Sequence, residues 1–242
     1  MNSHIKPYHT DASKKEEVAE MFNKISGSYD FLNRFFSLGI DVLWRKRALR
    51  IVRQSHPEVI LDMATGTADF AILAARRRIG SRIIGMDISA GMIEVGNKKI
   101  RKQKLDNIIS LRIADSESIP LSDGSVDVCM VAFGVRNFQN LQNGLSEICR
   151  VLRPGGKIVV LEFSKPTSLP VKWLFGFYFK ILMPLIGRLV SRDKRAYSYL
   201  PESVDAFPSG DAFVNELAQA GFQEGNALAL SGGIASIYSG VK

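Results

Sequence analysis

Residues 60–69, ILDMATGTAD, place a short apolar run directly before a turn of small residues. Such a turn between a strand and a helix lets a ligand approach the backbone closely. Of the three glycines in the dinucleotide-binding fingerprint only Gly66 is present, with Ala64 and Ala68 beside it. The turn therefore fits a nucleoside-type ligand, and on its own it fits a tight structural turn equally well.

Short apolar runs alternate with amphipathic segments from residue 58 onward. The apolar runs lie at 58–63, 82–86, 108–113, 126–133 and 157–163, and the helical patterns at about 68–79, 89–104 and 141–152. This alternation predicts a parallel sheet with right-handed crossovers. The C-terminal pattern predicts a helix N-capped by Ser209 and ended by Gly221, then strands at 226–231 and 234–241 that turn at Gly232-Gly233.

A helical segment is expected before the first strand. Residues 1–12 lack periodicity and are expected to fray. Ser13 and Glu16 form a capping box for an amphipathic helix over 13–26, and a second helix is expected from Asp41.

The length of 242 residues suits one domain, or one domain with an extension. We expect an N-terminal helical cap, 1–57, and a main domain, 58–242, with an apolar, basic insertion at about 165–208. Two cysteines in a chain of this size indicate a reducing, intracellular compartment, and the polar first twenty residues do not form a secretory signal. The three histidines suggest no metal site.

The net charge of +8 is uneven along the chain. Residues 1–164 carry +6, residues 165–200 another +6, and residues 201–242 carry −4. The dense segment is also apolar, but Lys180 and Pro184 interrupt it, which argues against a transmembrane helix. Contact of residues 165–200 with a membrane surface is the favoured interpretation, and a core-packed helix or a homodimer interface stays open.

Two further strand ends carry acidic residues. Asp87 follows the second apolar run and Asp115-Ser116 the third. A carboxylate at the second strand end accepts hydrogen bonds from a ribose diol, although each residue alone is equally explained as a helix cap or turn. Together with the turn at Gly66 they predict a nucleoside-type cofactor at the carboxyl edge of the sheet.

The blocks VDV at 126–128 and LRPGG at 152–156 complete an order that resembles class I S-adenosylmethionine-dependent methyltransferases. Other segments resemble the ubiquinone/menaquinone biosynthesis C-methyltransferase family; they are YDFLN at 29–33, SLG at 37–39, WR at 44–45, ATGT at 64–67, FGVRN at 133–137, LEFSKP at 161–166 and YSYL at 197–200. The resemblance runs from about residue 18 to the end. It implies a Rossmann-like α/β fold with a seven-stranded, mostly parallel sheet whose last strand is antiparallel. It also implies methylation of a polyprenylated quinol ring, as in demethylmenaquinol to menaquinol.

The resemblance places S-adenosylmethionine at a set of residues along the strand ends. The expected set is Asp62, Gly66, Thr67, Asp87, Ile88, Asp115 and Ser116. The family usually has glycine where Ala68 stands, and some members have serine where Ala132 stands. We expect at most a weaker affinity for the cofactor, provided that the backbone of Ala68 does not need a positive φ.

Carbon methylation requires a quinolate beside the sulfonium methyl in a site that excludes water. Arg136 is expected to stabilise the quinolate and Asn137 to orient it, with the alternative that Arg136 pairs structurally with Asp69 or Asp115. Tyr29 and Asp30 are expected to cover the pocket and relay the proton. Catalysis is expected to need no metal.

The sequence does not decide whether the methyl acceptor is a naphthoquinol or the benzoquinol of ubiquinone biosynthesis. Another hydrophobic phenol or a sterol is a further alternative, and a quinone or lipid carrier would not need Asp87 and Asp115. An RNA methyltransferase is a third class, but no nucleic-acid-binding motif is present and no nucleic acid is expected as a partner. We expect a cytoplasmic protein, peripheral at the inner face of the membrane.

Overall fold

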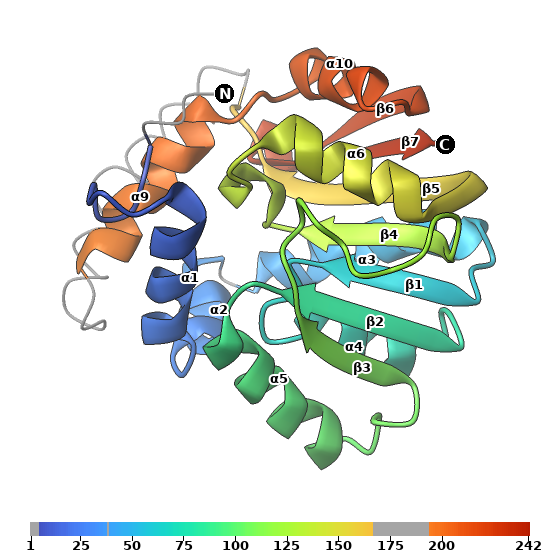
Figure 1. Ribbon diagram of the computed structural model, residues 1–242, viewed down its shortest axis with the longest axis horizontal. Helices are drawn as coiled ribbons and strands as arrows, with labels where there is room; N and C mark the ends of the chain where they lie inside the picture. The colour runs from blue at the N-terminus through green and yellow to red at the C-terminus, as the bar shows by residue number, and fades with distance from the viewer. Residues whose placement is uncertain (1–4, 38, 167–193) are drawn as a thin grey trace.

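The protein folds around one twisted seven-stranded sheet, as the sequence predicts (Figure 1). The computed structural model describes residues 5–37, 39–166 and 194–242. The strand order is β3-β2-β1-β4-β5-β7-β6; β7 runs antiparallel to the other six strands, which are parallel to one another. The strands are β1 (Val59–Met63), β2 (Arg82–Asp87), β3 (Ile109–Ile113), β4 (Val126–Ala132), β5 (Leu152–Phe163), β6 (Gln223–Leu230) and β7 (Ala235–Val241).

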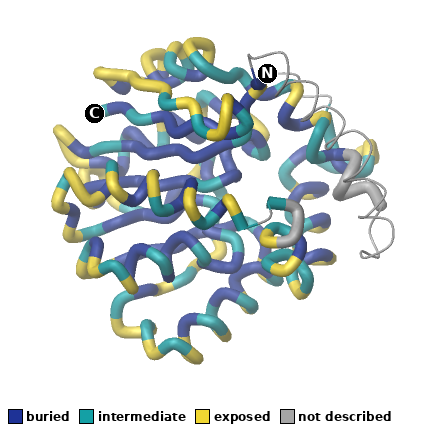
Figure 2. Tube along the Cα trace, turned by 180° about the vertical axis from the view of Figure 1, so that it is seen from behind, coloured by how far each residue is buried: buried dark blue, intermediate teal, exposed yellow. Residues whose placement is uncertain are grey.

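Helices cover both faces of the sheet. They are α1 (Lys14–Ile25), α2 (Tyr29–Phe36), α3 (Ile40–Gln54), α4 (Asp69–Arg76), α5 (Ala90–Lys102), α6 (Leu141–Val151), α9 (Lys194–Ala206) and α10 (Asp211–Gln219). Alternate residues of β4 serve two cores: Val128 and Met130 pack with α3 and α4, and Cys129 and Val131 pack with α6 and α10. The inner strands β1, β2, β4, β5 and β7 are mostly buried, and most residues of the edge strands β3 and β6 are exposed or only partly buried (Figure 2).

The structure adds elements that the local patterns did not predict. Helix α2 is a separate helix of eight residues, too short to be stable alone. Its Leu32 is buried among α1, α5 and α9 side chains, so tertiary packing stabilises it. Strand β5 begins at Leu152 rather than 157, because Leu152 continues the ladder opposite Val126.

The C-terminal turns differ from the prediction in detail. Gly210, not Ser209, is the N-cap of α10, with a φ of 65° that suits glycine. Gly221 follows the helix end at Ala220, as expected, and β6 and β7 form the predicted hairpin through a short 3₁₀ turn at Ser231–Gly233.

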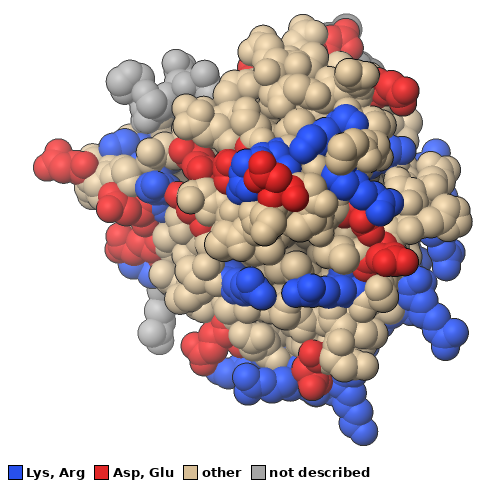
Figure 3. Space-filling view, turned by 45° about the vertical axis from the view of Figure 1, so that its right-hand side comes forward, with Lys and Arg blue, Asp and Glu red and all other residues tan. Residues whose placement is uncertain are grey.

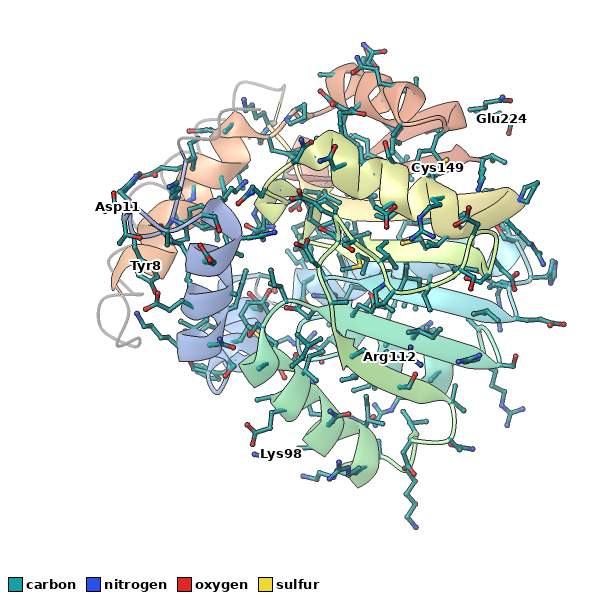
Figure 4. The ribbon with its side chains drawn as sticks, in the orientation of Figure 1. Tyr8, Asp11, Lys98, Arg112, Cys149 and Glu224 are labelled. Atoms are coloured by element: carbon teal, nitrogen blue, oxygen red, sulfur yellow. The ribbon has the colours of Figure 1, made fainter. Side chains whose placement is uncertain are left out.

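The segment before α1 is held in place, so the expectation that it frays is wrong for residues 5–12. The buried Glu17 carboxylate accepts hydrogen bonds from the backbone N–H groups of Tyr8 (2.6 Å), His9 (3.0 Å) and Thr10 (2.7 Å). Tyr8 accordingly lies close to α1 (Figure 4). The capping box of Ser13 and Glu16 is present as predicted.

Ala68 has a backbone conformation that normally requires glycine. Its φ is 65°. From the sequence, the Ala68 methyl is expected to be tolerated only if φ is not positive, and this is not the case. Ala64 and Phe133, at the ends of β1 and β4, also have positive φ values, 53° and 61°. Strained backbone thus gathers at the carboxyl edge of the sheet, where the sequence predicts the cofactor.

We expect Ala68→Gly to leave the free energy of unfolding unchanged or to raise it by up to about 1 kcal/mol, because relief of the strained φ offsets the lost methyl. The matched control Ala74→Gly, at a buried interior position of the same helix, should lower it by about 1–2 kcal/mol. Urea unfolding of both variants measures the difference. Equal losses at the two positions would show that Ala68 is not strained.

Candidate functional site

A pocket opens at the carboxyl ends of β1, β2 and β4, beneath α1 and α2. Its volume, including the open mouth, is about 660 Å³, within the usual range for ligand sites. Seven of the predicted site residues line it: Tyr29, Gly66, Asp87, Ile88, Asp115, Ser116 and Asn137. The other four predicted residues, Asp30, Asp62, Thr67 and Arg136, are not among its lining residues.

Asp87 is the buried carboxylate at the end of β2. Its Oδ2 accepts a hydrogen bond from Gly66 N (2.8 Å) and its Oδ1 from Ser89 N (2.9 Å). Burial raises the pKa of this carboxyl, and the backbone donors oppose the shift. Since each carboxylate oxygen has a second lone pair, Asp87 can also accept from the two hydroxyls of a ribose. The residue therefore fits the cofactor contact that its position implies.

Asp62 supports the turn beneath the pocket. Its Oδ2 accepts from Thr65 Oγ1 (2.6 Å) and Ala71 N (3.2 Å), and burial raises its pKa to about 7. Its buried Oδ1 has no hydrogen-bond partner among the described residues. Asp62 Oδ1 is thus left to accept a hydrogen bond from a bound cofactor or from water.

Thr67 and Asp30 belong to a polar cluster behind the pocket. The Thr67 hydroxyl donates to Asp30, and Lys99 of α5 contacts Asp30 (2.6 Å), Thr67 (3.1 Å) and Asp69. This cluster ties α2 to α4 and α5. Tyr29 is therefore the member of the expected Tyr29–Asp30 pair that faces the pocket.

Lys15 of α1 is a pocket residue that the sequence did not reveal. Its ammonium pairs with Asp115 Oδ2 (3.0 Å), while Asp115 Oδ1 accepts from Glu117 N (2.9 Å). Its contact to a carboxylate one hundred residues away depends on how α1 packs, and nothing in the local pattern indicates it.

Arg136 is buried and pairs with Glu162 of β5. Its Nη1 lies 2.8 Å from Glu162 Oε1 and donates to Phe133 O at 2.6 Å. The expected alternative partners are wrong, because Asp69 pairs with Lys99 and Asp115 with Lys15. Its Nε has no hydrogen-bond partner in the parts of the chain that the structure describes.

Asn137 lies in the pocket wall next to Arg136. Tyr199 of α9 is buried, and its hydroxyl donates to Asn137 Oδ1 at 3.1 Å. Burial raises the pKa of Tyr199, so its hydroxyl keeps the proton that it donates. The YSYL segment is the only sequence feature that singles out Tyr199, and it carries no assigned role.

Lys14 holds the turn that carries Arg136 and Asn137. Its buried ammonium donates to the carbonyl oxygens of Arg136 (3.0 Å) and Phe138 (2.9 Å). Burial, assisted by the positive charge of Arg136, lowers the pKa of Lys14 to about 8. Helix α1 is thereby fastened over one side of the pocket.

This low pKa predicts a pH dependence of stability. Between pH 8 and 10.5 the Lys14 amine of the unfolded chain is protonated and that of the folded chain is not, so the free energy of unfolding rises with pH. We expect a gain of up to about 3 kcal/mol across this window relative to Lys14→Met. Urea unfolding of both proteins at the two pH values measures it, and parallel behaviour of the two proteins would contradict the assignment.

The strand order and the pocket at the carboxyl edge define a Rossmann-like fold of the class I methyltransferase type. The fold is similar to an S-adenosylmethionine-dependent methyltransferase from Thermotoga maritima, described as a possible histamine N-methyltransferase, with a TM-score of 0.65 and 17% identity over 92% of this chain and 99% of that chain. The profile of the ubiE/COQ5 methyltransferase family matches residues 10–242. The chain belongs to the ubiE/COQ5 methyltransferase family and is an S-adenosylmethionine-dependent methyltransferase.

Relatives from two bacteria match almost the full length. The chain is 44% identical over 238 residues to the demethylmenaquinone methyltransferase of Bacteroides fragilis, covering 98% of this chain and 97% of the relative. It is 43% identical over 230 residues to the ubiquinone/menaquinone biosynthesis C-methyltransferase UbiE of Geotalea daltonii, covering 95% and 97%. The family resemblance seen in the sequence motifs is thus confirmed.

Proposed function

We propose that the chain methylates a ring carbon of demethylmenaquinol and yields menaquinol, with S-adenosylmethionine as the methyl donor. The observation that carries the proposal is one continuous pocket that joins Asp87, the cofactor carboxylate, to Asn137 and an aromatic wall that includes Tyr29 and Phe133. The names of the two relatives support the same reaction in quinone biosynthesis.

The bound cofactor supplies an electrophilic methyl group, and the protein must supply a nucleophilic ring carbon. We infer that the buried Arg136, which does not line the pocket and pairs with Glu162, stabilises electrostatically from behind the pocket lining the quinolate that forms when a ring hydroxyl loses its proton. Because Tyr199 occupies Asn137 Oδ1, the Asn137 amide N–H₂ is left to donate to a ring oxygen. Tyr29, in the pocket wall, shields the ring from water.

Initial rates measured on demethylmenaquinol and on 2-methoxy-6-polyprenyl-benzoquinol, side by side with the same prenyl chain, test the acceptor. We expect faster methylation of the naphthoquinol. The reverse order of rates would assign the chain to the benzoquinol step, and methylation of RNA instead of either quinol would refute the proposal.

Because a polyprenylated acceptor lies in the bilayer, we propose that the enzyme works as a peripheral, cytoplasmic protein at the inner face of the membrane. Within residues 5–37, 39–166 and 194–242, no helix is long and apolar enough to span a bilayer. The expected contact through 165–200 falls mostly on residues 167–193, which lie outside the described parts of the chain. A homodimer stays a prediction.

A further inference from the structure

Exposed apolar side chains of the described residues gather on two neighbouring helices. Among the side chains that the structure describes, four large hydrophobic ones are exposed, and three of them belong to α2 and α3: Phe31 (62%), Ile40 (38%) and Leu43 (61%). The fourth, Ile113, lies on edge strand β3. Since large apolar side chains are normally buried, such a cluster indicates a surface that is covered in use.

The same face of α3 continues as a basic stripe. Lys46, Arg47, Arg50 and Arg53 follow Leu43, and none of them forms an ion pair with a described residue. The only acid of the helix, Asp41, is buried and pairs with Arg34 and Arg45.

The spacing assigns these residues to the side of α3 that faces away from the sheet. Leu43, Arg47 and Arg50 are separated by four and three positions, so they share one helix face. Buried Ala48 and Val52 pack in the core beside the sheet. Helix α3, which is about 22 Å long, thus presents an apolar first turn and then a stripe of cations.

This surface adjoins the pocket. Tyr29 of α2 lines the pocket, and Phe31, two positions along the same helix, points to the opposite side. Helix α3 starts next to α2 at the pocket end of the molecule and crosses behind the sheet (Figure 1). By contrast, basic and acidic side chains are interspersed on the face drawn in Figure 3.

We propose that the outer face of α3, together with Phe31, docks on the surface of an anionic phospholipid bilayer. Phe31, Ile40 and Leu43 enter the boundary between headgroups and acyl chains, and the stripe from Lys46 to Arg53 contacts lipid phosphates. The apolar cluster leaves water and the mutually repelling cations gain counter-charges. The inference rests on the proposed function, because a prenylated acceptor lies in the bilayer that this face would touch.

Flotation of the full chain with vesicles tests the surface. The vesicles are phosphatidylcholine alone or phosphatidylcholine mixed with phosphatidylglycerol. We expect binding to the mixed vesicles, a loss of about 10-fold or more in partitioning for Arg47→Glu/Arg50→Glu, and a clear loss for Ile40→Ser/Leu43→Ser. The control Arg101→Glu/Lys102→Glu makes the same charge change on exposed residues of α5 and should bind nearly as the natural chain does.

Three results would overturn the docking surface. They are no binding of the natural chain to anionic vesicles, equal losses in the α3 and α5 charge variants, and α3-dependent binding to single-stranded RNA without vesicle binding. Methylation of a tail-less 1,4-naphthoquinol in solution reports on the proposed function separately. The α3 variants should retain that activity. Absence of methylation of both this analogue and detergent-solubilised demethylmenaquinol by the natural chain would refute the function, while α3-dependent vesicle binding would still support the surface.

Discussion

Replacing Asp87 with alanine should weaken S-adenosylmethionine binding by at least about 100-fold, because two hydrogen bonds to a buried carboxylate are lost. The carboxylate is buried at the end of β2 and already organised by the N–H groups of Gly66 and Ser89. Isothermal titration calorimetry measures the change. A folded Asp87→Ala protein that binds within about threefold of the natural chain would contradict the assigned cofactor contact.

Two comparisons separate lost binding from lost structure. Asp87→Ala leaves two backbone donors without their acceptor, so its thermal unfolding must be recorded. Asp115→Ala should have a smaller effect, about 10-fold, because that carboxylate is partly exposed and neutralised by Lys15. Equal losses of S-adenosylmethionine affinity in the two variants would contradict the larger contribution to cofactor binding that we assign to Asp87.

Arg136→Ala should lower turnover by about 100-fold or more while S-adenosylmethionine still binds. The reason is the loss of a positive charge that acts on the quinolate from behind the pocket lining. The same change leaves Glu162 buried without its ion-pair partner, which by itself destabilises the fold by about 3–5 kcal/mol. The single variant therefore mixes a catalytic effect with a structural one.

A double variant separates the catalytic effect of losing Arg136 from the structural one. Arg136→Met/Glu162→Met replaces the buried pair with apolar side chains, which should restore most of the free energy of unfolding. We expect this protein to fold, to bind the cofactor and to stay inactive when turnover is measured at saturating cofactor. Recovered turnover would show that Arg136 serves only to neutralise Glu162.

The parts of the site that the sequence predicts are those encoded locally. Asp87 is the last residue of β2 and Asp115 lies two positions after β3, so strand ends and acidic residues could be located together. Gly66 follows from the same logic, since small residues after a strand mark a turn. These residues line the pocket where the sequence places them.

The residues that α1 and α9 contribute could not be predicted in this way. Lys14 and Phe138 meet across 124 positions, and Tyr199 reaches Asn137 across 62. The partner of Arg136 was missed for the same reason: Glu162 lies on the next strand, 26 positions away. Such contacts depend on how the helices pack over the edge of the sheet, and the local hydrophobic pattern of the sequence does not contain this information.

The distribution of charge along the sequence also does not predict which charged residues form an exposed surface. Counting along the chain directs attention to residues 165–200, whereas the first 164 residues carry the same +6. Only the fold shows that the helix face with Leu43, Arg47 and Arg50 is exposed, while Asp41 of the same helix is buried and paired.

The central claim is methyl transfer to carbon, and product analysis tests it most directly. The protein is incubated with carbon-13 methyl-labelled S-adenosylmethionine and reduced demethylmenaquinone, and the quinone product is analysed by mass spectrometry and carbon NMR. Our account predicts a single labelled methyl group on a ring carbon, with one S-adenosylhomocysteine formed per methyl transferred. A label on a ring oxygen, or no labelled quinone from a folded protein that binds the cofactor, would contradict it.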